Sequence, residues 1–209
     1  MVKTLNRVLI YFLGLIILCL GVVLNTKTNL GVAAINAIPF VISKSTSFTL
    51  GNCVIVLYCI FILMQFIINK KVDLLTILQL PVSLLFGRMV DFVNIYILKF
   101  EASNIISGLI MLAIAILLVG LGTTLVISQN LIPNAPDGMV NALGRLFNKP
   151  FCYIKVRFDI ICVVFALIVS FLLAGKIVGI GLGTLISMLL TGNVCNFFKK
   201  ALGNKLNNQ

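Results

Sequence analysis

The sequence predicts an all-α polytopic membrane protein with about six transmembrane helices. They form two inverted three-helix repeats, each with a short broken or re-entrant helix. Three observations lead to this prediction. The 209 residues are 61% hydrophobic and only 10% charged, whereas soluble domains have about 25% charged residues. The apolar residues form runs long enough to cross a bilayer, which takes about 20 residues. Two shorter, broken segments occupy corresponding places in the two halves of the chain.

Six apolar runs are predicted to be membrane helices, because backbone polar groups in lipid must be paired within the structure. The first run follows a basic start, but its core of about 18 residues is longer than that of a signal peptide, and no small-residue cleavage site follows it. Arg88 and Asp91 interrupt the third run, and the fifth has an alternative start one turn earlier. The six runs are 8–24, 48–68, 74–98, 105–127, 158–173 and 177–198.

An internal repeat relates the two halves. The stretch GVVLNTKTNL at 21–30 matches GTTLVISQNL at 122–131, and residues 70–92 line up with 175–197. The order of a span, a broken segment and two spans occurs twice, which divides one membrane domain into repeats 1–100 and 101–209. Because each half has three spans, the second half must enter the membrane from the opposite side. Secondary transporters often have this arrangement, and their paired Gly/Pro-interrupted segments mark the binding site.

The broken segments are 31–44 and 133–147. In the second, PNAPDGMVNALGRLF, Asp137 is predicted to cap a helix that begins at Gly138. That helix would be about 15 Å long, half the thickness of a bilayer. The repeat symmetry favours a re-entrant segment. The alternative is an amphipathic helix on the cytoplasmic surface, with Arg145 and Lys149 facing lipid head groups.

The basic residues predict the orientation. With six spans and the N-terminus inside, more basic residues fall on the inner side than on the outer side, so both termini are expected in the cytoplasm. The net charge of +11 is explained by this bias and by attraction to anionic lipid. The sequence has no basic patch with interleaved aromatic residues, so it does not indicate nucleic-acid binding. The inner residues are Lys3, Arg7, Lys70, Lys71, Arg145, Lys149, Lys199, Lys200 and Lys205, and the outer ones are Lys27, Lys44, Lys99 and Lys176.

The second half contains NLIPNAPDGMVNALGRLFNKPFCYIKVRFD and AGKIVGIGLGTLISMLLTGNV, and the first half contains FGRMVDFVN. These stretches resemble the YczE/YyaS/YitT type of bacterial integral membrane proteins, in particular the YczE-like branch, over nearly the whole chain. The chain departs from the family where Ala33 and Ala34 replace a Pro-Trp-Asp turn. The resemblance implies a multi-pass protein of the bacterial cytoplasmic membrane, with small-molecule export or regulation of secondary metabolism as its role. The motif positions in this chain are Pro136, Asp137, Arg157, Gly181, Gly183, Thr184 and Asp91, with Asp159 as the nearest acidic residue after the arginine.

Polar and ionisable residues inside spans or broken segments are the candidates for a substrate or ion pathway, since such residues are costly in lipid. Arg88 and Asp91 share a helix face, where they form either a functional pair or a structural one near the outer interface. Arg157 either faces the interior, where it could meet Asp137, or anchors the interface, and Lys155 is interpreted as an interface marker. The complete candidate set is Asp137, Arg157, Asp159, Asn36, Asn134, Asn141, Arg88 and Asp91.

Two functions are carried forward. The first is a secondary transporter or exporter of a small solute, in which Asp137, Asp91 or Asp159 couples proton or sodium binding. The second is a non-transporting membrane regulator or accessory protein, for example in secondary-metabolite production. An enzyme is not expected, because the chain has no histidine and no recognisable nucleophile–base pair. No metal and no cofactor are expected. The expected partners are the lipid bilayer, a small-molecule or ion substrate and, as an option, a second copy in a homodimer.

Overall fold

A computed structural model describes residues 2–71 and 73–206, and this part of the chain is helical throughout, without strands. The all-α prediction is therefore confirmed. Two helices are short, α2 (Ala34–Ser45) and α6 (Ala135–Phe147), and a π-helical turn, η1 (Val93–Ile97), continues α4. The six long helices are α1 (Val2–Thr26), α3 (Leu50–Asn69), α4 (Leu74–Phe92), α5 (Ile105–Ser128), α7 (Phe151–Ala174) and α8 (Leu182–Leu206).

Five of the described helices, and not six, are long and apolar enough to cross a membrane. The sixth predicted span fails in two ways. Gly175 and Gly179 adopt positive φ angles of 64° and 68°, which ends α7 and delays the start of α8. Asn193 and Lys199 then interrupt the apolar residues of α8. The five candidate spans are Leu5–Thr26, Leu50–Asn69, Leu74–Ile97, Ile105–Ser128 and Tyr153–Ala174.

For the fifth span the alternative start, one turn before residue 158, is the closer of the two predictions, because the span begins at Tyr153. α7 itself starts at Phe151, directly after Pro150, whose fixed φ suits the entry to a helix. Lys155 and Arg157 therefore lie on α7.

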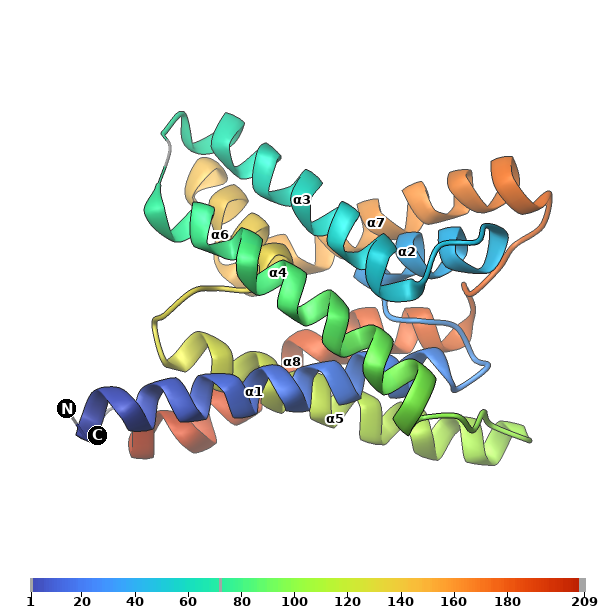
Figure 1. The fold of residues 1–209 in the computed structure, drawn as a ribbon, viewed down its shortest axis with the longest axis horizontal. Coiled ribbons are helices and arrows are strands. Elements are labelled where there is room, and N and C mark those ends of the chain that lie inside the picture. The colour runs from blue at the N-terminus through green and yellow to red at the C-terminus, as the bar shows by residue number, and fades with distance from the viewer. Residues whose placement is uncertain (1, 72, 207–209) are drawn as a thin grey trace.

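α1 and α5 run antiparallel side by side along the lower face of the bundle in Figure 1, and we call them the central pair because α4 packs on α1 and α8 packs on α5. Glycine lets their backbones approach closely. A Cβ atom built on Gly122 would lie 2.5 Å from the backbone nitrogen of Leu18, and one on Gly21 would lie 2.8 Å from that of Val119. Any side chain at these two crossing points would push the helices apart.

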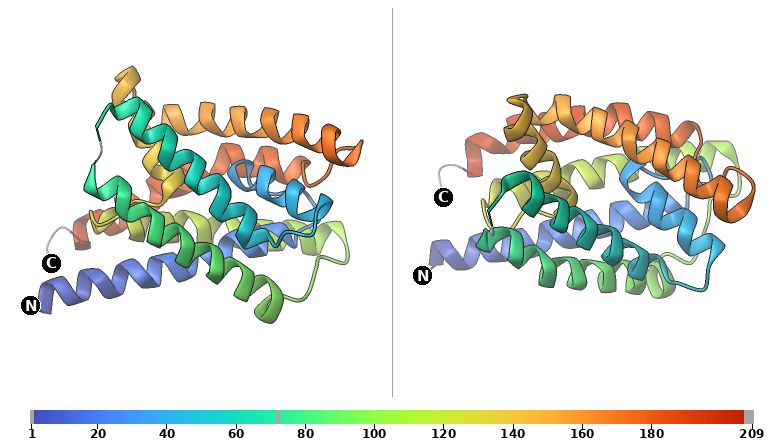
Figure 2. Two further views of the ribbon diagram at one scale, coloured as in Figure 1. Left: turned by 45° about the horizontal axis from the view of Figure 1, so that its top comes forward. Right: turned by 90° about the horizontal axis from the view of Figure 1, so that it is seen from above.

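Both short helices lie on the same side of this central pair, above it in Figure 1, and they point toward opposite ends of the bundle (Figure 2). α2 packs mainly against α7, and α6 packs mainly against α3. α4 lies beside α3, and α8 lies beside α5. The described start of α1 and the described end of α8 lie at the same end of the molecule (Figure 2).

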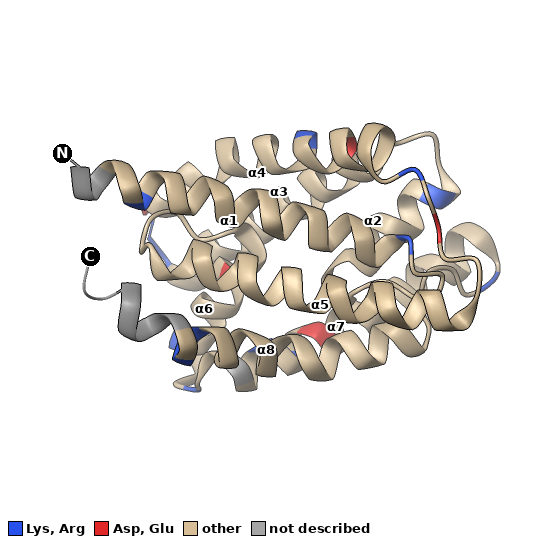
Figure 3. Cartoon of the chain, turned by 90° about the horizontal axis from the view of Figure 1, so that it is seen from below, with Lys and Arg blue, Asp and Glu red and all other residues tan. Residues whose placement is uncertain are grey.

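The outward faces of the long helices are apolar. Ile67, Ile106 and Leu172 are 75%, 72% and 78% exposed, and many other large hydrophobic side chains accompany them. Lys and Arg lie mainly toward the two ends of the bundle, and few charged residues lie along its middle (Figure 3). So large an exposed apolar surface is unfavourable in water and fits a bundle surrounded by lipid. We therefore conclude that the protein is located in a membrane.

A buried amide pair holds α6 in the bundle. Gln65 of α3 and Gln79 of α4 donate to each other's side-chain oxygen, at 2.9 and 3.1 Å, and Gln65 also donates to the Ala135 carbonyl at 3.3 Å. Gly138 packs directly on the two amides. Because both amides are paired, this polar cluster fixes the first turn of α6 between α3 and α4.

Candidate functional site

A cavity of about 70 Å³ lies inside the bundle, where the first turns of α2 and α6 meet side chains of α1, α3, α5, α7 and α8. We call it the central cavity. Its volume is several times the 10–15 Å³ that one water molecule needs. The lining is mostly apolar, but it includes three acidic or basic side chains, Asp137, Lys155 and Asp159. Its uncharged polar side chains include Asn25, Asn36, Thr123, Asn134, Ser187 and Thr191.

The local sequence of α6 places Asp137 in this cavity. Asn134 has an extended backbone (φ −61°, ψ 145°), and its side-chain oxygen accepts a hydrogen bond from the Ala135 amide. The helix therefore begins at Ala135, and the prediction that Asp137 caps a helix starting at Gly138 is wrong. Asp137 instead lies in the first turn, where the partial positive charge of the helix N-terminus favours a carboxylate. The residue is only 5% exposed.

The start of α2 has nearly the same backbone but different side chains. Ala33 has φ −58° and ψ 142° and provides no side-chain cap. Its amide donates to the side-chain oxygen of Asn25, whose nitrogen donates to Ser187 at 3.3 Å. Asn36 follows in the first turn of α2, is 6% exposed, and has a buried Oδ1 atom with no hydrogen-bond partner.

Lys155 and Asp159 form a buried ion pair on α7. Their positions differ by four, so they share a helix face, and the Lys155 Nζ lies 2.9 and 3.1 Å from the two carboxylate oxygens of Asp159. The two side chains are 10% and 5% exposed. Lys155, interpreted from the sequence as an interface marker, therefore faces the interior of the bundle. Burial of such a pair is costly, which makes it a functional candidate.

Four predicted site residues lie outside the central cavity, and Arg157 and Asn141 are two of them. Arg157 does not face the interior. It is exposed, with its guanidinium 3.4 Å from the centre of the Tyr153 ring and a hydrogen bond to the Tyr153 carbonyl. It is two residues from Lys155, so it projects from a different face of α7. Asn141 is half-buried on α6 and does not line the central cavity.

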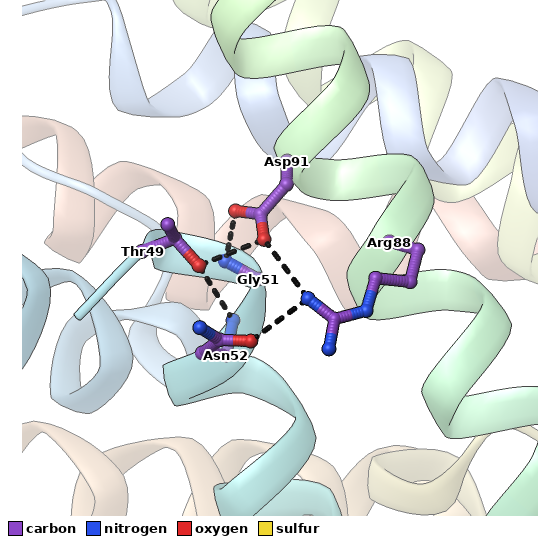
Figure 4. Close-up of polar contacts among 5 residues, drawn as sticks. All are labelled: Thr49, Gly51, Asn52, Arg88 and Asp91. Atoms are coloured by element: carbon purple, nitrogen blue, oxygen red, sulfur yellow. Dashed lines mark hydrogen bonds and ion pairs between the residues drawn. The ribbon is translucent and has the colours of Figure 1, made fainter.

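Arg88 and Asp91 contact each other, as their spacing predicts, with 3.9 Å between Nη1 and Oδ2. The principal role of Asp91 is to bind the N-terminus of α3: it accepts hydrogen bonds from the Thr49 hydroxyl and the Gly51 amide, both at 2.7 Å (Figure 4). The Arg88 side chain is 67% exposed and also donates to Asn52. This cluster joins α3 to α4 outside the central cavity.

Replacing Asp91 by alanine should destabilise the protein by about 1–2 kcal/mol, because the Gly51 amide and the Thr49 hydroxyl lose their acceptor. Unfolding in detergent would measure the loss. Arg88→Ala is the matched control, and it should cost less than about 1 kcal/mol because an exposed ion pair contributes little. Equal losses in the two variants would contradict the capping role of Asp91.

Four predicted residues, Asp137, Asp159, Asn36 and Asn134, line the same cavity although they come from three separate helices. Sequence reasoning missed Asn25, Thr123 and Ser187, because single polar residues within long apolar runs give no distinct signal. It also missed the role of Lys155. The signal for Lys155 was present in its spacing of four from Asp159, since a charge inside a span needs a partner.

Among the described residues, no group of three or more His, Cys, Asp or Glu side chains could hold a metal ion. The model of a family of unknown function, DUF6198, matches residues 5–200. No curated protein and no solved structure matches the chain.

Proposed function

Because the chain belongs to the DUF6198 family, whose function is unknown, we propose a function from the site itself: a secondary transporter or exporter of a small solute. The observation that carries the proposal is the central cavity, which lies at the first turns of two short helices and contains the buried charged residues Asp137, Lys155 and Asp159. Transporters bind solutes where such half-helices begin. The motif that contains Asp137, together with the Gly181–Gly183–Thr184 run, supports a relationship to the YczE-like proteins.

We propose that the two halves are inverted repeats, and four backbone features support this. Asn29 and Asn130, 101 positions apart, end α1 and α5 with φ angles of 54° and 50°. Lys70 and Gly175, 105 positions apart, end α3 and α7 with φ angles of 50° and 64°. Few residues other than glycine adopt positive φ. Positive φ angles at matching positions would therefore be unusual if the two halves were unrelated.

The helix contacts support the same proposal. Under the repeat, α1, α2, α3 and α4 correspond to α5, α6, α7 and α8. The contact of α2 with α7 then has its counterpart in the contact of α6 with α3, and that of α1 with α4 in that of α5 with α8; both members of each pair are present. The glycine contacts also agree, because Gly21 meets Val119 and Gly122 meets Leu18, and each residue is 101 positions from its counterpart.

The repeat gives α8 the role of a sixth crossing, since its counterpart α4 is among the apolar spans. We propose that α8 tolerates polar residues because it borders the central cavity with Ser187, Thr191 and Gly192. Six crossings put both termini on one side, and the excess of basic residues on that side makes it the cytoplasm. α2 and α6 then enter the membrane from opposite faces as re-entrant helices.

Transport requires that the central cavity open to each face in turn. α1 and α5 cross at close backbone contact, which makes them the natural axis about which the two halves rock. The α1–α2 connection touches the α7–α8 connection through Val32–Gly179 and Gly183–Leu30 hydrogen bonds of 2.8 and 2.7 Å. On the other side, the Gln65–Gln79 pair ties α6 to α3 and α4. For the solute to pass, each of these two contacts would have to break on its own side of the membrane.

Cysteine accessibility tests the proposal without knowledge of the solute. In a cysteine-free variant, single cysteines replace Thr123 or Thr191 in the central cavity. We expect a small membrane-impermeant thiol reagent to label both from either face of the membrane. Lys176→Cys should react only from outside, and Arg145→Cys only from inside.

These two exposed positions verify that each membrane preparation has the intended orientation. Labelling of the cavity positions from one face alone, or from neither, would contradict alternating access. A static cavity of that kind would instead favour a regulator or accessory protein that binds a ligand without moving it.

A further inference from the structure

We propose that the central cavity binds a monovalent cation, sodium or a proton, between the Asp137 carboxylate and the Asn36 side-chain oxygen. The inference rests on the function proposed above and specifies it further, since this cation would be the coupling ion of the transporter. Its binding can be tested separately, because a cation site does not require transport. The inference rests on charge, on an unpaired acceptor and on the room available.

Charge is the first argument. The central cavity has two carboxylates, Asp137 and Asp159, and one ammonium, Lys155. The described residues form two ion pairs, and Asp137 is in neither of them. Lys155 is bonded to both oxygens of Asp159. An ionised Asp137 therefore leaves one uncompensated negative charge inside the bundle, which is costly where water is excluded.

The N-terminus of α6 compensates this charge only in part. A helix N-terminus carries the equivalent of about half a positive charge, whereas the carboxylate carries a full negative one. A proton on Asp137, or a sodium ion beside it, would complete the neutralisation. Both ligands are cations, and they neutralise the same carboxylate.

Asn36 provides the second argument. Its Oδ1 atom is buried without a hydrogen-bond partner, in a residue that is 6% exposed and lines the same cavity. An unpaired buried acceptor is unfavourable, and a cation or a donor beside it would offset that cost. Under the repeat, Asn36 and Asp137 are equivalent, 101 positions apart. The two half-helices would thus contribute one ligand each.

The third argument is space and surroundings. The cavity of about 70 Å³ has room for an ion and several waters. The other titratable groups that line it are Lys155 and Asp159 of α7, Tyr58 of α3 and Cys195 of α8. α2 and α5 contribute uncharged lining residues. Lys155 has the further effect of excluding a second cation from Asp159.

Two measurements on the purified full-length protein in lipid nanodiscs test the site. The first compares thermal unfolding in sodium chloride and in choline chloride at equal ionic strength. Bound sodium should raise Tm by at least about 2 °C over choline. The second is infrared spectroscopy of the carbonyl stretch of protonated carboxyl groups, which would detect a proton on Asp137.

Asp137→Asn should abolish whichever signal the wild-type protein gives, whereas Asp91→Asn, the same exchange outside the cavity, should retain it. Asn36→Ala removes the unpaired oxygen without changing a charge and should weaken a sodium effect at least tenfold in apparent Kd. A sodium-specific shift identifies sodium, and a carboxyl band that depends on Asp137 identifies the proton. The absence of both signals, or their persistence in Asp137→Asn, would overturn the proposal.

The outcomes also separate this inference from the transport proposal. Labelling of the cavity from both faces without a cation signal would support transport and contradict the cation site. A cation signal with labelling from one face only would support the cation site and contradict transport.

Discussion

Replacing Lys155 by methionine is expected to destabilise the protein by about 3–5 kcal/mol, the usual loss when one partner of a buried ion pair is removed. Methionine retains much of the aliphatic volume of lysine, so the packing changes little. Asp159 would remain 3% exposed and lose both of its hydrogen bonds from the Lys155 ammonium. Asp137 would lose the Lys155 ammonium, which lines the same cavity.

The double variant Lys155→Met/Asp159→Leu distinguishes an ionic cause from a packing cause. Because it removes both charges, it should recover most of the lost stability. Reversible unfolding in mixed micelles would measure the change in the free energy of unfolding. Arg88→Met is the matched control, since its ion pair is exposed, and it should lose less than about 1 kcal/mol. A double variant no more stable than Lys155→Met would disprove the ionic explanation.

The helical class and most of the spans could be predicted from the sequence, because each long apolar run has few backbone solutions in lipid. The α8 boundary could not be predicted in the same way. Its position depends on Gly175 and Gly179, whose positive φ angles become apparent only in the folded chain. The sequence predicts the start of α7 only to between residue 158 and one turn earlier, because charged residues there make the end of the span ambiguous. In the structure Lys155 and Asp159 compensate each other and the helix continues through them.

The site could be predicted in part, for a related reason. Asp137 and Asn36 were identified because turn-rich segments inside apolar sequence are unusual and point to half-helices. The choice between Lys155 and Arg157 depends on the rotation of α7, which packing decides. Arg157 points outward to Tyr153, and Lys155 points into the bundle. A two-residue difference on a helix reverses the face, so spacing from Asp159 was the better guide.

The charges of the central cavity come from the second half alone. The first turns of α3, residues 50–58, correspond to the charged start of α7 and contain no charged residue. Tyr58 and Phe86 stack in this region, with ring centres 5.9 Å apart, and Phe61 packs on Phe158 at 5.2 Å. The first half therefore has packed aromatic side chains near the place where the second half has a buried ion pair. Under the repeat, the two halves share a backbone design, but only the second half contributes charged side chains to the cavity.

Substituting Gly122 with alanine should destabilise the protein by about 1–3 kcal/mol, the usual cost of overpacking, and should lower the yield of folded protein. The new methyl group would lie 2.5 Å from the backbone nitrogen of Leu18 and 2.7 Å from its Cα atom. Backbone atoms in a helix cannot move aside singly, so α1 and α5 would have to separate. Truncating the Leu18 side chain should therefore fail to rescue the variant. The repeat predicts a similar loss for Gly21→Ala.

Gly192→Ala is the control for this prediction, because a Cβ atom there meets nothing within 4 Å. In the interior of α8 alanine is a better helix former than glycine by about 0.5–1 kcal/mol, so this variant should be as stable as the wild type or slightly more so. Thermal unfolding and size-exclusion profiles of the three variants in one detergent would measure the effects. If Gly122→Ala and Gly192→Ala unfold alike, α1 and α5 do not cross in close contact at Gly21 and Gly122. These two helices could then not be the axis of the proposed motion.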